Sequence, residues 1–187
     1  MVKQHLKSHN QLRLFGLMVL FLVQSNIALA HGPTRQKVTE SVQINASAEA
    51  VWNTISEFGN ATWLPMVDKS ESDKGNEDGA TRTLVLSSGD QIIETLKSYN
   101  EAKMSYKYRI PDASHDVAIL PVNNYSATIS VKADGNNAIV TWKGAFYRGY
   151  PNNDPPDELN DEAAVKAVTE LYKAGLSGLK KLIEGTG

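Results

Sequence analysis

The end of the chain carries its clearest pattern of hydrophobic and polar positions. From Asn160 to Glu184 there is no proline, and apolar or small residues recur at intervals of three and four. This spacing places the following residues on one helical face: Ala164, Val168, Leu171, Gly175, Leu179 and Leu182. Asn160 can cap the segment at its start and Gly185 can end it. The pattern therefore predicts a long amphipathic helix.

Residues 36–147 show a different pattern, in which apolar and polar residues alternate. Runs rich in β-branched and aromatic residues are interrupted every ten or so residues by Gly, Asn and Asp, as in antiparallel hairpins. The pattern predicts extended segments at residues 36–44, 81–87, 91–99, 103–110, 120–131 and 137–147. Glu40 falls on the apolar face of the first segment, as a pocket carboxylate or as an edge or bulge position.

Two short helical pieces are expected between the first two of these segments. Ser47 can cap a helix whose buried side carries Val51, Trp52 and Ile55. Gly59-Asn60 ends this piece, and a second one carries Trp63-Leu64 before Pro65 stops it. Together with the strands, they predict a sheet wrapped around the last helix.

The hairpin at residues 81–99 brings two charges onto an apolar face. Arg82 alternates with Leu84 and Leu86, and Glu94 alternates with Ile92 and Leu96. A three-residue loop at 88–90 places Leu84 opposite Glu94, with Arg82 as the diagonal neighbour of Glu94. The two side chains then meet inside the sheet, either as a structural ion pair or as a ligand contact.

The same alternation collects polar and aromatic residues on the concave face of the sheet. These candidate ligand-binding residues are Arg82, Glu94, Tyr106, Tyr108, Asn123, Tyr125 and Trp142. Tyrosine and tryptophan combine a large apolar surface with one polar group, which suits a pocket. The alternative is an ordinary core with hydroxyls at its rim. Gly175 on the last helix fits either a close approach of a strand or space for a ligand.

The first thirty residues have the features of a secretory signal peptide. Lys3, Lys7 and Arg13 precede an apolar run at 14–23, and Ala28-Leu29-Ala30 follows as a cleavage site. That run is shorter than the roughly 20 residues that span a bilayer. We therefore expect residues 1–30 to be removed, residues 31–187 to form one domain in the periplasm, and no membrane span to remain.

Charge and composition narrow the possible partners. The chain has 19 Lys+Arg and 21 Asp+Glu, and residues 1–30 hold three of the bases and none of the acids, so 16 against 21 leaves a formal charge of −5. No basic stripe interleaved with aromatic residues is present, so a nucleic-acid partner is not expected. The chain has no cysteine, which excludes thiolate metal sites and disulfides.

Few residues in the expected mature chain suit catalysis or metal binding. Its only histidines, His31 and His115, are far apart, and His31 could bind copper only with further ligands that are not evident. No glycine-rich phosphate loop, nucleophile elbow or Ser/His/Asp set is visible. Acid/base chemistry by Glu94 with a tyrosine is the only catalysis the residues suggest. We expect no cofactor and a non-catalytic protein.

Several segments of the chain form a recognisable combination. They are Val51-Trp52, Phe58, Trp63-Leu64-Pro65, Arg82-Thr83-Leu84, Glu94, Tyr106-Lys107-Tyr108-Arg109-Ile110, Leu120-Pro121-Val122-Asn123-Asn124-Tyr125 and Trp142. This combination resembles the polyketide cyclase/dehydrase branch of the START-like (SRPBCC, Bet v 1-like) superfamily, over nearly all of residues 36–185. The resemblance implies an α+β helix-grip fold, in which one strand, two short helices and six further strands form a curved antiparallel sheet around a long C-terminal helix.

A finer resemblance concerns function. The start at His31-Gly32-Pro33-Thr34 and the tract after it are similar to periplasmic MxaD-type proteins associated with methanol dehydrogenase. This implies an accessory role in methanol oxidation, with methanol dehydrogenase or its cytochrome as partner. The alternative is a carrier of a small hydrophobic ligand, or a polyketide cyclase-like enzyme, that uses the cavity.

The proline-rich segment 150–157 precedes the last helix. It is too rich in proline to pair as a strand and too long for a minimal turn. It is either a plain connector or a stiff docking segment, for which the acidic balance of the chain favours a basic partner surface.

Overall fold

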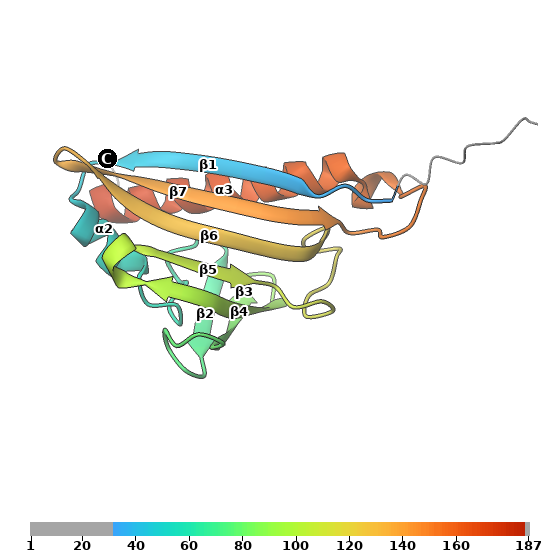
Figure 1. Ribbon diagram of the computed structural model, residues 1–187, viewed down its shortest axis with the longest axis horizontal. Coiled ribbons are helices and arrows are strands. Elements are labelled where there is room, and N and C mark those ends of the chain that lie inside the picture. The colour runs from blue at the N-terminus through green and yellow to red at the C-terminus, as the bar shows by residue number, and fades with distance from the viewer. Residues whose placement is uncertain (1–31, 186–187) are drawn as a thin grey trace, which may run out of the picture. The chain divides into compact units, whose positions relative to one another are not determined.

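The computed structural model describes residues 32–185 as one antiparallel sheet with two α-helices (Figure 1). The strands are β1 (Gln36–Ile44), β2 (Val67–Ser72), β3 (Thr81–Leu86), β4 (Gln91–Asn100), β5 (Ser105–Arg109), β6 (Val122–Asp134) and β7 (Asn137–Arg148). The helices are α2 (Ala48–Ile55) and α3 (Asp161–Glu184). Two short 3-10 turns span Glu101–Lys103 and Asp157–Leu159.

The strand order β1-β7-β6-β5-β4-β3-β2 joins neighbours in sequence except at one place, where β1 pairs with β7. The long helix α3 packs on the inner side of the sheet, chiefly against β1 and β7, and α2 contacts β6 and β7 near one end (Figure 1). This is the expected helix-grip arrangement. Within residues 32–185, neither helix has the length and apolarity to cross a membrane.

The helix α3 forms where the sequence predicts it, although its buried stripe differs. The Asn160 side chain accepts a hydrogen bond from the Ala163 backbone N–H at 2.8 Å and so caps the first turn. Its buried residues are Ala164, Val168, Tyr172, Gly175, Leu176 and Leu179. Leu171 is only half-buried and Leu182 is 60 % exposed, because the buried stripe is centred nearer Tyr172 and Leu179 and both leucines lie at its edge.

Gly175 allows α3 to approach the sheet closely. A Cβ atom at this position would lie 2.8 Å from Leu64 Cδ2 and 2.8 Å from Trp142 Cζ3. Such distances are shorter than real Cβ contacts allow, so a side chain here would displace Leu64, the Trp142 ring or the helix itself. Of the two expectations for Gly175, close packing holds, because the Trp142 side chain of β7 occupies the space beside it.

Three expectations about local structure are wrong. Residues 61–66 form turns instead of a second short helix, because the Asn60 side chain accepts from the Thr62 backbone N–H at 3.2 Å and Pro65 prevents continuation. The segment expected to begin at residue 103 becomes a strand only at Ser105, after Met104 adopts a left-handed conformation at φ 45°. The third error is that the alternation predicted no strand at 67–72, because the edge strand β2 is mostly polar and exposed; the seven strands implied by the family resemblance include it.

Glu40 is half-buried on β1, which is an edge strand of the sheet, and does not line the interior cavity. Its place on the apolar face is therefore that of an edge position. The proline-rich segment forms no strand, as expected, and leads into the 3-10 turn before α3.

The two leucines near the end of α3 provide a matched test of the observed stripe. Leu179→Ala removes a fully buried side chain, and should lower the free energy of unfolding by about 2–5 kcal/mol. Leu182→Ala changes an exposed position of the same helix and should lower it by less than about 0.5 kcal/mol. Urea unfolding followed by tryptophan fluorescence measures both. Equal losses would contradict the buried stripe described above.

Candidate functional site

A buried ion pair joins β3 to β4. Arg82 Nε lies 2.5 Å from Glu94 Oε2, and the two residues are 1 % and 4 % exposed. Arg82 Nη1 also donates to the Phe58 carbonyl oxygen at 2.8 Å, and the guanidinium lies 4.3 Å from the centre of the Phe58 ring. The predicted meeting of Arg82 and Glu94 inside the sheet is confirmed.

The register that brings the pair together differs from the predicted one. Arg82 lies directly opposite Glu94, and Leu84 lies opposite Ile92. The connecting loop spans residues 87–90 rather than 88–90, with Gly89 in the left-handed region at φ 90°. The Leu86 backbone N–H donates to the Asp90 carbonyl at 2.9 Å, so the turn is centred one residue earlier than predicted. This moves the pairing by two residues, which keeps both charges on the same face and places them opposite each other instead of diagonally.

Burial sets the protonation behaviour of the pair. Burial raises the pKa of the Glu94 carboxyl, and the Arg82 guanidinium only partly offsets this effect. For Arg82, burial acts to lower the pKa, but the Glu94 carboxylate together with Tyr106 and Tyr108 outweighs it and leaves the pKa above its ordinary value. Each charge is therefore held in the interior by the other.

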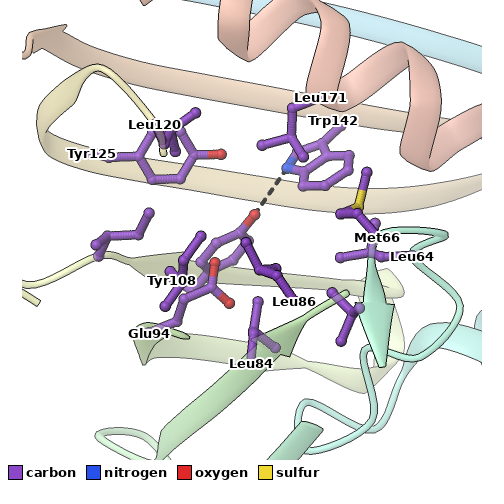
Figure 2. A pocket seen from close by; sticks show the side chains of 13 residues that line it. Leu64, Met66, Leu84, Leu86, Glu94, Tyr108, Leu120, Tyr125, Trp142 and Leu171 are labelled. Atoms are coloured by element: carbon purple, nitrogen blue, oxygen red, sulfur yellow. Dashed lines mark hydrogen bonds between the residues drawn. The ribbon is translucent and has the colours of Figure 1, made fainter. Parts of the chain in front are cut away.

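A small cavity of about 40 Å³ lies beside Glu94, between the sheet and α3 (Figure 2). It is lined by Leu64, Met66, Val67, Leu84, Leu86, Ile92, Glu94, Tyr108, Ile110, Leu120, Tyr125, Trp142 and Leu171. A buried water needs roughly 10–15 Å³ of this kind of volume, whereas ligand pockets measure about 300–1,000 Å³. The cavity therefore has room for a few waters and not for an organic ligand of ordinary size.

Aromatic rings occupy the rest of the concave face. The Trp142 indole N–H donates to the Tyr108 hydroxyl at 3.1 Å (Figure 2), and the hydroxyls of Tyr125 and Tyr172 are 2.6 Å apart. Burial raises the pKa values of Tyr108 and Tyr125 well above the ordinary value. These phenols therefore stay neutral and act in hydrogen bonding, not as bases.

The structure brings four of the seven candidate residues to the cavity, namely Glu94, Tyr108, Tyr125 and Trp142. Arg82 lies behind Glu94 and does not line the cavity. Tyr106 packs against the rings of Trp52 and Phe58, with ring centres 6.1 and 6.0 Å away, and its buried hydroxyl has no hydrogen-bond partner.

Asn123 was expected on the same face as Tyr125, and this expectation is wrong. A β-bulge lies between Asn123 and Ser126, where Asn124 adopts φ 48°. The extra residue reverses the alternation, so Val122 and Tyr125 are both buried while Asn123 is only half-buried. The Asn123 side chain instead donates to the carbonyls of Arg148 and Gly149, at 3.2 and 2.7 Å.

Sequence reasoning identified only part of the aliphatic cavity wall. It placed Leu84, Leu86, Ile92 and Leu171 on inward faces, but it did not identify Met66, in the turn before β2, or Leu120, in the loop before β6. No local pattern links these segments, so no sequence signal could have grouped them. Within residues 32–185, no three His, Cys, Asp or Glu side chains are close enough together to hold a metal ion.

Comparisons with known proteins agree with this geometry. Residues 35–184 match the family described as polyketide cyclase / dehydrase and lipid transport. Protein XoxI from Bacillus cereus is 32% identical over 80% of this chain and 96% of its own, with a TM-score of 0.65. An uncharacterized protein from Bacillus thuringiensis is 31% identical over 80% of this chain and 99% of its own, with a TM-score of 0.66.

Norcoclaurine synthase from Thalictrum flavum shares the fold alone. It is 18% identical over 82% of this chain and 89% of its own, with a TM-score of 0.57. The comparison with curated proteins gives no match.

The ion pair generates a prediction about pH. Arg82→Met leaves Glu94 buried without its cation, which should lower the free energy of unfolding at neutral pH by about 3–5 kcal/mol. The folded-state pKa of Glu94 then lies further above its unfolded value, so the part of the loss due to the isolated carboxylate grows as the pH rises toward the folded-state pKa and is absent below the unfolded value. The part due to the lost Phe58 contacts is the same at both pH values. Urea unfolding at acidic and neutral pH measures this difference.

A double variant provides the control for that experiment. Arg82→Met with Glu94→Leu removes both charges, and should be more stable at neutral pH than Arg82→Met alone. If the single variant were equally destabilised at both pH values, the loss would come from packing and not from the isolated carboxylate.

Proposed function

This chain belongs to the polyketide cyclase / dehydrase and lipid transport family, and from that premise we propose that it acts through its surface. In this proposal it is an exported, non-catalytic accessory protein of methanol oxidation, which assists methanol dehydrogenase or its cytochrome. The observation that carries the proposal is the nearly filled interior. A cavity of about 40 Å³ does not admit a polyketide or a lipid.

The groups inside the fold are also poorly placed for catalysis. The Glu94 carboxylate is bound to Arg82, and the tyrosine hydroxyls that line the cavity are neutral. A general base has to reach a substrate proton, which requires space for the substrate beside it. The arrangement therefore favours a structural role for the pair.

The partner is proposed from the similarity of the expected mature start, residues 31–34, to MxaD-type periplasmic proteins. Residues 1–31 lie outside those that the structure describes, so signal-peptide cleavage stays a prediction. Export to the periplasm would place the chain in the compartment of such a system.

The segment at 150–157 has the properties of a docking loop. Arg148 is 7 % exposed, and its guanidinium donates to the Tyr150 carbonyl at 2.9 Å and to the Asn152 carbonyl at 2.8 Å. These bonds hold the loop in one conformation, and Asp154 and Asp157 are exposed on it. A loop that is already ordered loses less conformational entropy on binding.

Carriage of a small hydrophobic ligand is the second candidate. Its support is the cavity wall, where Met66, Leu86 and Leu171 have unbranched or γ-branched side chains that can change rotamer. For a ligand to enter, these side chains would have to move and enlarge the cavity.

Neutralising the loop tests the accessory role. Asp154→Asn with Asp157→Asn should slow association with methanol dehydrogenase or its cytochrome at low salt, without changing the melting temperature, because both residues are exposed. Asparagine also tolerates the left-handed conformation of residue 154, at φ 56°. Biolayer interferometry with immobilised partners measures the rates.

The control removes the same charge from another exposed loop. Glu77→Gln with Asp78→Asn should leave association nearly unchanged. An equal effect of the two double variants would mean that net charge, and not the loop, governs binding.

The small volume of the cavity predicts a negative result with apolar ligands. Aromatic and fatty-acid probes should not raise the melting temperature in differential scanning fluorimetry, because the cavity has no room for them. A clear rise with any of these probes, together with no binding to either partner, would favour the carrier function over the accessory one.

A further inference from the structure

The outer face of the sheet carries basic residues in two adjacent rows across its strands. In one row Lys107 on β5 lies opposite Thr128 on β6, and Thr128 lies opposite Lys143 on β7. In the next row Arg109 on β5 lies opposite Ser126 on β6. Ser126 lies opposite Ala145 on β7, and Ala145 lies opposite Lys37 on β1. Since strands are about 4.8 Å apart, Lys107 and Lys143 are separated by roughly 10 Å.

Short polar side chains lie between and beside these cations. A third row consists only of hydroxyl residues, which are Ser105, Ser130, Thr141 and Ser41. The Oγ of Ser41 and the Oγ1 of Thr141 are 3.0 Å apart. The outer face thus carries long cationic side chains, with short hydroxyl side chains between and beside them.

A hollow of about 170 Å³ adjoins these rows. It is lined by Lys97, Lys107, Arg109, Ile110, Asp112, Asn124, Tyr125 and Ser126. Lys97 reaches it because a bulge in β4, between Leu96 and Ser98, displaces that residue from the regular pairing. Three cations therefore border one depression, and Asp112 is the single carboxylate among its lining residues.

We define the basic face as Lys37, Lys97, Lys107, Arg109 and Lys143, all of which are exposed. The salt bridges found within residues 32–185 involve other basic residues, which are Lys69, Arg82, Arg148 and Lys180. The basic face therefore holds five cations that form no salt bridge with a carboxylate of residues 32–185. This is a local positive charge on a chain that has more acidic than basic residues.

We propose that the basic face is the docking site for an acidic surface of a protein partner, with one partner carboxylate held in the hollow. Lysine and arginine at the rim of an interface steer a negatively charged protein and raise its association rate. The cations extend from β4 to β1, well beyond the hollow, which suits an extended acidic surface better than a small anion.

The face lacks what other anionic partners require. Insertion into a lipid surface uses exposed Trp, Phe or Leu side chains, and the rows carry none. Single-stranded nucleic acid stacks on exposed aromatic rings. Tyr147 is the nearest ring on the outer side of β7, but it is half-buried and the Arg35 guanidinium lies 5.3 Å from its centre.

The docking site rests on the proposed function only for the choice of natural partners, so its first test uses an acidic peptide that does not depend on that choice. A hexaglutamate peptide is titrated into the isotopically labelled, exported protein, and backbone amide shifts are followed by NMR. Shifts should concentrate on β5 and β7. They should vanish in Lys107→Gln with Lys143→Gln, and persist in the control Lys166→Gln with Lys173→Gln, which removes two exposed lysines from α3.

The second test uses methanol dehydrogenase and its cytochrome. For whichever of them binds, Lys107→Gln with Lys143→Gln should slow association about tenfold at low salt and little at high salt, while the α3 control stays near the unmodified protein. If a partner binds and both double variants match the unmodified protein, the docking site is wrong and the proposed function stands. If neither partner binds but hexaglutamate maps to β5 and β7, the proposed function fails and the docking site stands.

Three further results would overturn the docking site. The first is the absence of peptide shifts at millimolar hexaglutamate, or shifts centred elsewhere. The second is binding to vesicles of equal parts phosphatidylglycerol and phosphatidylethanolamine that the Lys107→Gln, Lys143→Gln variant loses. The third is displacement of the peptide by equimolar inorganic phosphate, which would assign the hollow to a small anion.

Discussion

The position of Trp142 sets the distance between the long helix and the sheet. Its indole stacks on Tyr172 with ring centres 4.3 Å apart and occupies the space above Gly175, while its N–H is bound to the Tyr108 hydroxyl. The Trp142 side chain of β7 thus contacts both α3, through Tyr172 and Gly175, and β5, through Tyr108. The small size of the cavity follows, because this ring and the buried aromatic rings around it fill most of the space between the helix and the sheet.

The ion pair determines a different property, which is the pairing of β3 with β4. Desolvation can cancel the attraction between buried charges, so Arg82 and Glu94 are weak evidence for added stability. A shift of the pairing by one residue, however, would move each charge to the opposite face and separate it from its partner. With Phe58 also bound to the guanidinium, the pair ties this hairpin to the chain that follows α2.

The sequence predicted the parts of this structure that depend on local patterns. The last helix, the first strand, the Ser47 cap and the aromatic concave face follow from periodicity and capping chemistry. What it did not predict depends on single backbone conformations or on contacts between distant segments. The turn after β3 is centred one residue earlier than predicted, which changed the hairpin register, and the left-handed Asn124 changed the face of Asn123. The basic face could not be recognised because its members are spread from Lys37 to Lys143.

The pairing of β1 with β7 also affects how the chain folds. The first strand borders the last one and packs beneath the last helix, so the sheet cannot close before residues 137–184 have been synthesised. Contacts between such distant parts of a sequence slow folding, because a large loop has to be closed first. For a protein proposed to be exported, this delay is useful. The newly made chain stays unfolded for longer before translocation and can pass through a translocation channel. It then depends less on chaperones to keep it unfolded.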